Sequence, residues 1–121
     1  MPASPLEHLP LTSVVMHILL ALADEDRHGY AIAQEVERVS HGAVLMGPGT
    51  LYGSIQRLVK DGLVEESRRR SRAGDDGRRR YYRLTALGRR VLAAESARLD
   101  ELVAVARSKL VLRPSNAPHL A

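Results

Sequence analysis

The sequence contains no cysteine, tryptophan or phenylalanine, and tyrosine, with four residues, supplies its few large aromatic rings. Without cysteine, the protein has no disulfide framework and no thiolate metal site. Without large aromatic side chains, the hydrophobic core has to be built from leucine, valine, isoleucine and alanine, which suits helices. These absences exclude redox chemistry at cysteine and favour a mainly α fold.

Long hydrophobic segments are also absent. The longest apolar run, residues 14–23, is interrupted by His17 and is too short to span a bilayer. The first ten residues, MPASPLEHLP, lack the basic and apolar regions of a secretion signal. We therefore expect a cytoplasmic protein that does not enter a membrane.

The sequence offers little support for catalysis. Its five histidines form no HxxxH or HExxH pair, and no nucleophile stands beside a base in a recognisable spacing. We predict a protein that is not an enzyme and that has no resident cofactor or metal. A metal-sensing regulator stays open as an alternative, because histidine, aspartate and glutamate could still bind a metal across a dimer.

Positive charge is concentrated in one part of the chain. The 121 residues carry a net charge of +4, with an isoelectric point of about 10.0. Most of the excess lies between Arg57 and Arg90, where many arginines are opposed only by Asp61, Glu65, Glu66, Asp75 and Asp76. Such clustering is typical of a phosphate-binding surface. The alternative is a solvated basic hairpin that keeps the protein soluble.

Hydrophobic periodicity predicts three helices in the first half of the chain. Residues 11–23 are apolar almost all round, and residues 30–39 are amphipathic. The third helix is predicted from Pro48 to Lys60, because proline is tolerated at the first helical position and Gly62 follows the last one.

A β-hairpin and one long helix are predicted in the second half. The runs LVEESRRR and RRRYYRLT flank a polar turn that contains glycine, which is typical of a hairpin with a long, charged tip. From Thr85 to residue 112 the chain is free of proline and favours a helix.

Three helices followed by a hairpin are the layout of a winged helix-turn-helix, in which the third helix enters the DNA major groove. The predicted fold class is mainly α with a small β-hairpin. We expect a flexible N-terminus (1–10), a winged helix-turn-helix domain (11–84), a C-terminal dimerisation helix (85–112) and a disordered tail (113–121).

The third helix carries a glycine at an unusual place. On a helical projection Leu51, Ile55 and Leu58 form one face, and Gly53 lies near the middle of the opposite face. Glycine costs a helix about 0.8 to 1 kcal/mol relative to alanine, but here it would let the backbone approach DNA closely. The alternative is a glycine tolerated on a solvated face. The other DNA contacts expected on this helix are Gly49, Thr50, Gln56, Arg57 and Lys60.

Three segments, ILLALADEDRHGYAIAQEVE, GPGTLYGSIQRLVKDGLVEE and RRRYYRLTALGRRVL, resemble the PadR family of bacterial transcriptional regulators. The resemblance covers residues 11–92 and rests on the spaced motifs HGY, GTLY and RRYYxLTxxG. It implies a homodimeric winged-helix repressor that binds a pseudo-palindromic operator and is released by a ligand or stress signal. The implied partners are double-stranded DNA, a second copy of the chain and a small-molecule inducer.

The resemblance also implies roles for single residues. Tyr52 of GTLY is expected to contact DNA, whereas Tyr30 of HGY is expected to pack inside the domain. Tyr81 and Tyr82 point to opposite sides of a strand, and which of them faces outward stays open. The wing contacts are expected from Arg70, Arg72, Arg78, Arg79 and Arg80. A ligand stacked between tryptophans, as in some small members, does not transfer because the chain has no tryptophan.

The long C-terminal helix predicts a dimer independently of the resemblance. Its apolar residues recur in steps of three and four, as in a coiled coil, and so small a domain cannot bury the whole seam. Two recognition helices also need about 34 Å between them. Packing on the first helix of the same chain is an alternative that can hold together with dimerisation. The residues expected in the dimer interface are Val15, Leu19, Leu92, Leu99, Val103, Ala106 and Leu110.

The sequence therefore predicts a dimeric, ligand-responsive DNA-binding repressor. An alternative from another class is a winged-helix protein-interaction module whose basic hairpin meets an acidic partner. A repressor should prefer one operator at physiological salt, whereas an interaction module should bind DNA weakly and without sequence preference.

Overall fold

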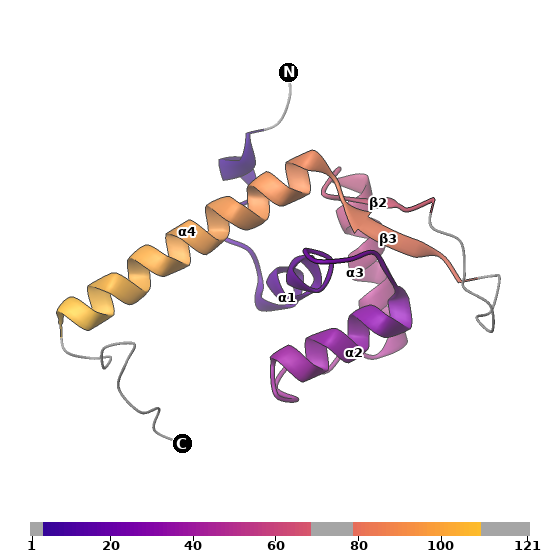
Figure 1. Ribbon diagram of the computed structural model, residues 1–121, viewed down its shortest axis with the longest axis horizontal. Coiled ribbons are helices and arrows are strands. Elements are labelled where there is room, and N and C mark those ends of the chain that lie inside the picture. Colours follow the sequence, from indigo (N-terminus) through magenta and orange to yellow (C-terminus); the bar gives the residue numbers. More distant parts are fainter. Residues whose placement is uncertain (1–3, 69–78, 110–121) are drawn as a thin grey trace.

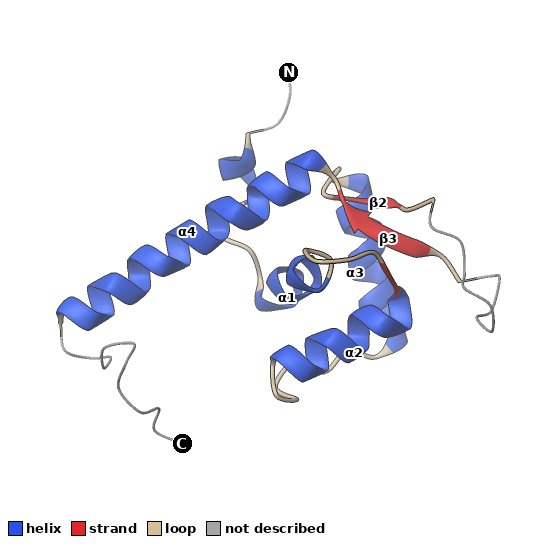
Figure 2. Ribbon diagram, viewed as in Figure 1, coloured by secondary structure: helices blue, strands red, loops and turns tan. Residues whose placement is uncertain are grey.

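The computed structural model describes residues 4–68 and 79–109, in which α1 lies among the other helices and α4 projects away from them (Figure 1). Helices dominate and the strands are short, so the predicted fold class is confirmed (Figure 2). The elements in chain order are η1 (Pro5–His8), α1 (Ser13–Ala21), β1 (Arg27–His28), α2 (Gly29–Val39), α3 (Pro48–Lys60), β2 (Val64–Glu66), β3 (Tyr81–Leu84) and α4 (Ala86–Ser108).

The core is aliphatic, as the composition predicts. Helix α1 starts where Thr12 Oγ1 accepts a hydrogen bond from the Val15 amide at 3.2 Å, and it contacts both α2 and α4. The four helices α1 to α4 and the sheet all contribute side chains to the core. The buried cluster consists of Ile18, Leu19, Ala21, Leu22, Ile32, Val36, Leu51, Ile55, Leu58, Leu63, Val64, Leu84, Val91 and Leu92.

Two residues expected in the dimer interface belong to this core instead. Leu19 is fully buried and Leu92 is 8% exposed within the single chain, so neither has surface to offer a partner. The assignment of Leu19 was wrong because α1 is apolar almost all round, and periodicity cannot tell its core face from an interface face. Leu92 lies in the part of α4 that packs on its own domain.

Helix α3 has the predicted bounds. Gly47 is its N-cap without a side-chain hydrogen bond, and Pro48 is its first residue. At the other end, the amide of Leu63 donates to the Leu58 carbonyl at 2.9 Å, which closes the helix and turns the chain into β2. The start and stop signals of the sequence therefore place this helix correctly.

The sheet has a third strand that the sequence did not reveal. Its order is β1-β3-β2, with β3 in the middle and both pairings antiparallel. In β1, Arg27 is opposite Tyr82 and His28 is opposite Tyr81. A strand of two residues inside the polar segment DEDRHG is too short to show an alternating pattern. Because β1 leads directly into α2, it joins the start of that helix to the hairpin.

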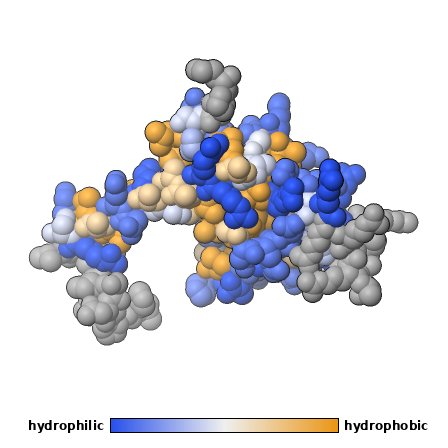
Figure 3. All heavy atoms as spheres, turned by 45° about the horizontal axis from the view of Figure 1, so that its top comes forward, coloured by the Kyte–Doolittle hydropathy of each residue, from blue (hydrophilic) through white to orange (hydrophobic). Residues whose placement is uncertain are grey.

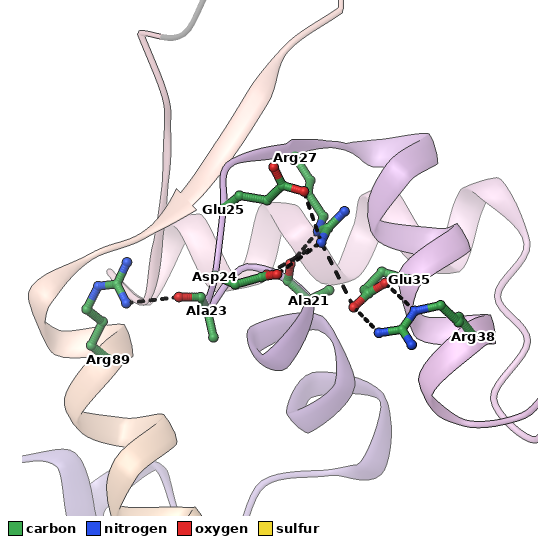
Figure 4. Close-up of polar contacts among 8 residues, drawn as sticks. All are labelled: Ala21, Ala23, Asp24, Glu25, Arg27, Glu35, Arg38 and Arg89. Atoms are coloured by element: carbon green, nitrogen blue, oxygen red, sulfur yellow. Dashed lines mark hydrogen bonds and ion pairs between the residues drawn. The ribbon is translucent and has the colours of Figure 1, made fainter.

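Arg27 ties the end of α1 to the surrounding loop and to α2 (Figure 4). Its Nε donates to the Ala21 carbonyl at 2.7 Å, which satisfies one of the last carbonyls of α1. Its Nη2 lies 3.4 Å from Asp24, 3.2 Å from Glu25 and 3.9 Å from Glu35. The Arg27 side chain is 17% exposed and that of Glu35 is 16% exposed, so the contact between them is shielded from water, whereas Asp24 and Glu25 are 67% and 51% exposed.

We expect the Arg27→Ala variant to lose about 1 to 3 kcal/mol of unfolding free energy, because a carbonyl at the buried residue Ala21 loses its donor. Urea unfolding of the variant and the wild type measures this loss. Arg38→Ala is the matched control, since Arg38 is 70% exposed and pairs only with Glu35 among its described contacts. Equal stability of the two variants would contradict this role for Arg27.

The first turn of helix α4 is in close contact with the backbone of residues 62–63. Thr85 Oγ1 accepts from the Gly88 amide at 3.0 Å and donates to the Gly62 carbonyl at 2.5 Å. A Cβ at Gly88 would lie 2.0 Å from the Leu63 carbonyl oxygen. Only glycine allows this approach, so the start of α4 is pressed directly against the backbone between α3 and β2.

Glu95 is a buried carboxylate in α4, 1% exposed, and its role could not be predicted from the sequence. It accepts a hydrogen bond from the Leu11 amide at 2.8 Å and two from Arg98, at 2.5 and 3.0 Å. The Arg98 hydrogen bonds, and to a smaller extent that from Leu11, hold the pKa of Glu95 below its ordinary value of 4.5, although burial acts in the opposite direction. This carboxylate fastens the segment before α1 to α4.

The lowered pKa of Glu95 predicts a pH dependence of stability. The folded state binds this proton less readily than the unfolded state, so the contribution is full above pH 4.5 and is lost as pH falls below it. We expect Glu95→Gln to be less stable than the wild type at neutral pH, with the difference shrinking toward pH 3. Chemical unfolding at several pH values measures it. Glu101→Gln, at an exposed site on α4, is the control; a difference for Glu95→Gln that does not change with pH would be the contrary result.

Candidate nucleic-acid interface

Helix α3 presents the predicted outward face. Leu51, Ile55 and Leu58 are buried, and Ser54 joins them at 5% exposed. Gly53 is half-buried, yet apart from its two chain neighbours and the adjacent α3 backbone no heavy atom of the described residues lies within 4 Å of where its Cβ would be. The space in front of Gly53 is therefore open to another molecule. The exposed residues of this face are Gly49, Thr50, Gln56, Arg57 and Lys60.

Tyr52 lies on the flank of α3 and reaches the start of α2. It is 47% exposed, and its hydroxyl lies 2.6 Å from where a Cβ on Gly29 would be. Gly29 must be a glycine to keep Tyr52 in this position, which explains the central residue of the HGY motif. The side chain implied by the resemblance as a DNA contact is thus held at the junction of α2 and α3.

The wing is the hairpin formed by β2 and β3, and the structure describes two of the five arginines predicted to contact DNA from it. Arg79 and Arg80 are exposed and lead into β3, whereas Arg70, Arg72 and Arg78 lie outside the described residues. Outside the tip, Arg83 of β3 pairs with Glu65 of β2, with Nε 3.1 Å from Oε2.

Tyrosines 81 and 82 lie in different environments. Tyr81 is 5% exposed and its ring meets the His28 ring edge-on, with centroids 5.4 Å apart. Tyr82 is half-buried on the other side of β3. Burial and the nearby Glu66 carboxylate raise the pKa of Tyr82, so its hydroxyl keeps its proton. Tyr81 is therefore the more buried of the two, whereas Tyr82 packs against the core cluster with part of its side chain exposed.

Residues from the start of α2, from α3 and from the base of the wing line an open pocket of about 270 Å³. Tyr30 belongs to it and is 61% exposed, so the expectation that Tyr30 packs inside the domain is wrong. Sequence reasoning missed the pocket because its parts come from three separate motifs, HGY, GTLY and RRYY, and only the fold brings them together. Its lining residues are His28, Gly29, Tyr30, Tyr52, Arg79, Arg80 and Tyr82, and we call it the aromatic pocket.

The second half of α4 carries apolar side chains away from the core, as the hydropathy of its projecting end shows (Figure 3). Leu99 is 36% exposed and Leu102 is 53% exposed. Val103 and Ala106 are half-buried on the same side of the helix. Val15 on α1 is also half-buried, and Leu110 lies outside the described residues. None of the helices in the described part of the chain is long and apolar enough to cross a membrane.

Three helices, a sheet that extends from the last of them and an exposed face on α3 define a winged helix-turn-helix regulator. The family model of the transcriptional regulator PadR-like family matches residues 18–94. The chain therefore belongs to this family, whose members are transcription regulators and not enzymes.

Individual relatives agree with this assignment. A transcriptional regulator of Mycobacterium tuberculosis is 42% identical over 90 residues, which cover 74% of this chain and 78% of that protein. A PadR family transcription regulator from Clostridium difficile is 25% identical, with a TM-score of 0.65 over 82% of this chain and 99% of that one. A PadR-like regulator from Bacillus cereus shares the fold, with 20% identity and a TM-score of 0.68 over 92% of this chain and 100% of that one.

Proposed function

We propose that this protein is a homodimeric, sequence-specific DNA-binding repressor that acts in the cytoplasm on a pseudo-palindromic operator. The observation that carries the proposal is the aromatic pocket, because it joins Tyr52 of α3 to Arg79 and Arg80 of the wing. The recognition helix and the wing base thus form one continuous surface that is rich in donors. This surface matches the way in which a winged helix meets a major groove and its flanking backbone.

Each exposed residue of α3 has a chemical role in this proposal. Gln56 can pair with adenine, and Arg57 can pair with guanine or a phosphate. Lys60 neutralises a phosphate at the end of the helix. The open space at Gly53 lets the α3 backbone lie close to the base edges, while the first amides of the helix, near Gly49, can bind a phosphate.

Dimerisation supplies the second recognition helix in this proposal. The exposed side of α4 around Leu99 and Leu102 has the steps of three and four that pair helices. A second copy of the chain would cover it by two-fold symmetry, and the two α3 helices would then read two half-sites about 34 Å apart.

A response to a small-molecule inducer is supported by a second pocket. This pocket, of about 400 Å³, lies between the start of α1 and α3, and its walls include Val14, Val15 and Leu58. Its volume falls in the range of small-molecule sites, about 300 to 1,000 Å³. Thr50 and Arg57 also line it, so a ligand bound there would contact two of the residues proposed to meet DNA.

Fluorescence anisotropy tests the proposal. The protein is titrated onto a labelled fragment from upstream of its own gene, onto fragments selected by binding from genomic DNA, and onto shuffled controls, at two salt concentrations. A repressor binds one fragment tightly near physiological salt and leaves its shuffled control unbound. Equal, salt-sensitive binding to every fragment would contradict the proposal and favour the interaction module.

A further inference from the structure

The pocket between the start of α1 and α3, which we call the α1–α3 pocket, contains a buried hydroxyl. Ser54 lines this pocket and is 5% exposed, so it lies on the buried face of α3. Among the described residues, none forms a hydrogen bond with the Ser54 hydroxyl. A buried hydroxyl without a partner is unfavourable, and such groups in proteins are usually paired. The Ser54 hydroxyl is therefore available to a molecule that enters the pocket.

Two opposite charges lie beside this hydroxyl. Arg57 and Asp61 both line the pocket and are one helical turn apart on α3, a spacing at which oppositely charged side chains commonly pair. In the part of the chain that the structure describes, neither side chain forms an ion pair or a hydrogen bond. Both are exposed. The pocket thus offers a cation and an anion at once, which suits a ligand that carries both signs of charge.

The apolar part of the wall is aliphatic. It is formed by Val14 and Val15 of α1 and Leu58 of α3, and the described lining has no aromatic ring and no further charged group. A compact aliphatic group can lie against these side chains and leave water. The volume of about 400 Å³ is near the lower end of the range for small-molecule sites, about 300 to 1,000 Å³, which favours a small ligand.

We propose that the α1–α3 pocket binds a small aliphatic zwitterion of the α-amino acid class, and that this ligand competes with DNA for Arg57. The ligand carboxylate pairs with Arg57 and its ammonium group with Asp61. The Ser54 hydroxyl, which can both donate and accept, bonds one of these two groups. The aliphatic side chain of the ligand lies on the two valines. This inference rests on the proposed function and deepens it by naming the class of inducer.

Competition follows from the chemistry of a single guanidinium group. The donors of Arg57 can serve a base edge or a DNA phosphate, or they can serve the ligand carboxylate, but the planar fork pairs with only one of them at a time. Thr50 also lines the pocket and is the second residue that the ligand and DNA would share. Because coupling between two ligands is reciprocal, a zwitterion that excludes DNA lowers the operator affinity of the protein. Helix α3 does not have to move.

Three compounds with one carbon skeleton test the class of ligand. They are L-leucine, 4-methylpentanoate, which lacks the ammonium group, and 3-methylbutylamine, which lacks the carboxylate. Isothermal titration calorimetry of the full-length protein without DNA measures their binding, and alanine, valine and isoleucine complete the panel. We expect the best amino acid of the panel to bind at least about tenfold more tightly than its analogues without one charge, because each analogue loses a charged hydrogen bond.

Two outcomes of the calorimetry would overturn the inference. Equal binding of an amino acid and its two singly charged analogues would show that the two charges on α3 do not select a zwitterion. Binding of no compound in the panel would show that the pocket is not such a site, as when a second copy of the chain covers it.

Ser54→Ala and Asp61→Asn remove two pocket groups that are not among the proposed DNA contacts. Each should weaken binding of the best amino acid about tenfold and should not weaken operator binding in its absence. Ser54→Ala should also be at least as stable as the wild type, since alanine favours a helix and no hydroxyl stays buried. Reduced stability of Ser54→Ala would show that this hydroxyl has a structural partner and would contradict the inference. Asp100→Asn, at an exposed site on α4, is the matched control for Asp61→Asn.

Fluorescence anisotropy then tests the competition. The best amino acid, titrated into the complex with the selected operator, should release DNA from the wild type and from Asp100→Asn at a concentration that leaves the Ser54→Ala complex intact. Binding in calorimetry without release of DNA would overturn the competition. If an operator is bound specifically but no amino acid binds, this inference alone fails. If an amino acid binds but no fragment is bound specifically, the proposed function fails, and the competition fails with it.

Discussion

The Gly53→Leu variant is expected to fold normally and to lose sequence-specific DNA binding. Outside its own stretch of α3, a Cβ at position 53 has no described heavy atom within 4 Å, so the added leucine starts out into open space. That space is where the proposed DNA lies against α3. Binding to the operator should fall to the non-specific level, a loss of about 10³-fold or more, because specific binding exceeds non-specific binding by at least that factor. Fluorescence anisotropy with operator and shuffled DNA measures it.

Gly53→Ala is the companion variant that separates helix stability from DNA approach. It should stabilise the protein by about 0.8 to 1 kcal/mol, because alanine favours a helix more than glycine does. Its DNA affinity should fall less than that of Gly53→Leu. Normal operator binding by Gly53→Leu would show that Gly53 is only tolerated on a solvated face, and the proposed docking of α3 would have to be given up.

The second large effect is expected from a double substitution, Leu99→Asp with Leu102→Asp. Both side chains are exposed in the single chain, so the domain should keep its fold. Two charges in the proposed seam should prevent α4 from pairing, and sedimentation should show monomers. Because a monomer engages only one half-site, operator affinity should drop about 10²- to 10⁴-fold.

Ala104→Asp provides the control for this variant. Ala104 is exposed on the side of α4 away from Leu99 and Leu102, so an added charge there should leave the dimer and its DNA affinity intact. Monomers from Ala104→Asp would move the proposed interface to another face of α4, and dimers from the double aspartate variant would remove α4 from the interface.

The sequence predicted elements best where local signals were strong. Helix α3 has its predicted bounds because Pro48 and Gly62 mark its ends. The long helix was expected over residues 85–112 and is described as Ala86–Ser108, since capping by Thr85 is a local property. Hydrophobic periodicity also separated the buried and exposed faces of α3 correctly.

The features that the sequence could not predict depend on contacts between distant segments. Strand β1 exists because β3 offers it a partner, and Glu95 is buried because the Leu11 segment and Arg98 satisfy it. Tyr30 was misplaced for the same reason, because its neighbours in the aromatic pocket come from α3 and the wing. Hydrophobic periodicity describes one element at a time and gives no information on contacts between elements that are distant in the sequence.

The close contact between Gly88 and the Leu63 backbone couples the orientation of α4 to that of the domain. Its 23 residues span about 35 Å, and at its base Gly88 lies directly against the Leu63 backbone. In the proposed dimer, the angle at which the two α4 helices cross would therefore set the distance between the two α3 helices. A rotation of about 10° at the crossing would displace the far end of a 35 Å arm by about 6 Å, more than one turn of α-helix. A signal that changes only how two α4 helices lie on each other would thus be transmitted in full to the DNA-reading surface.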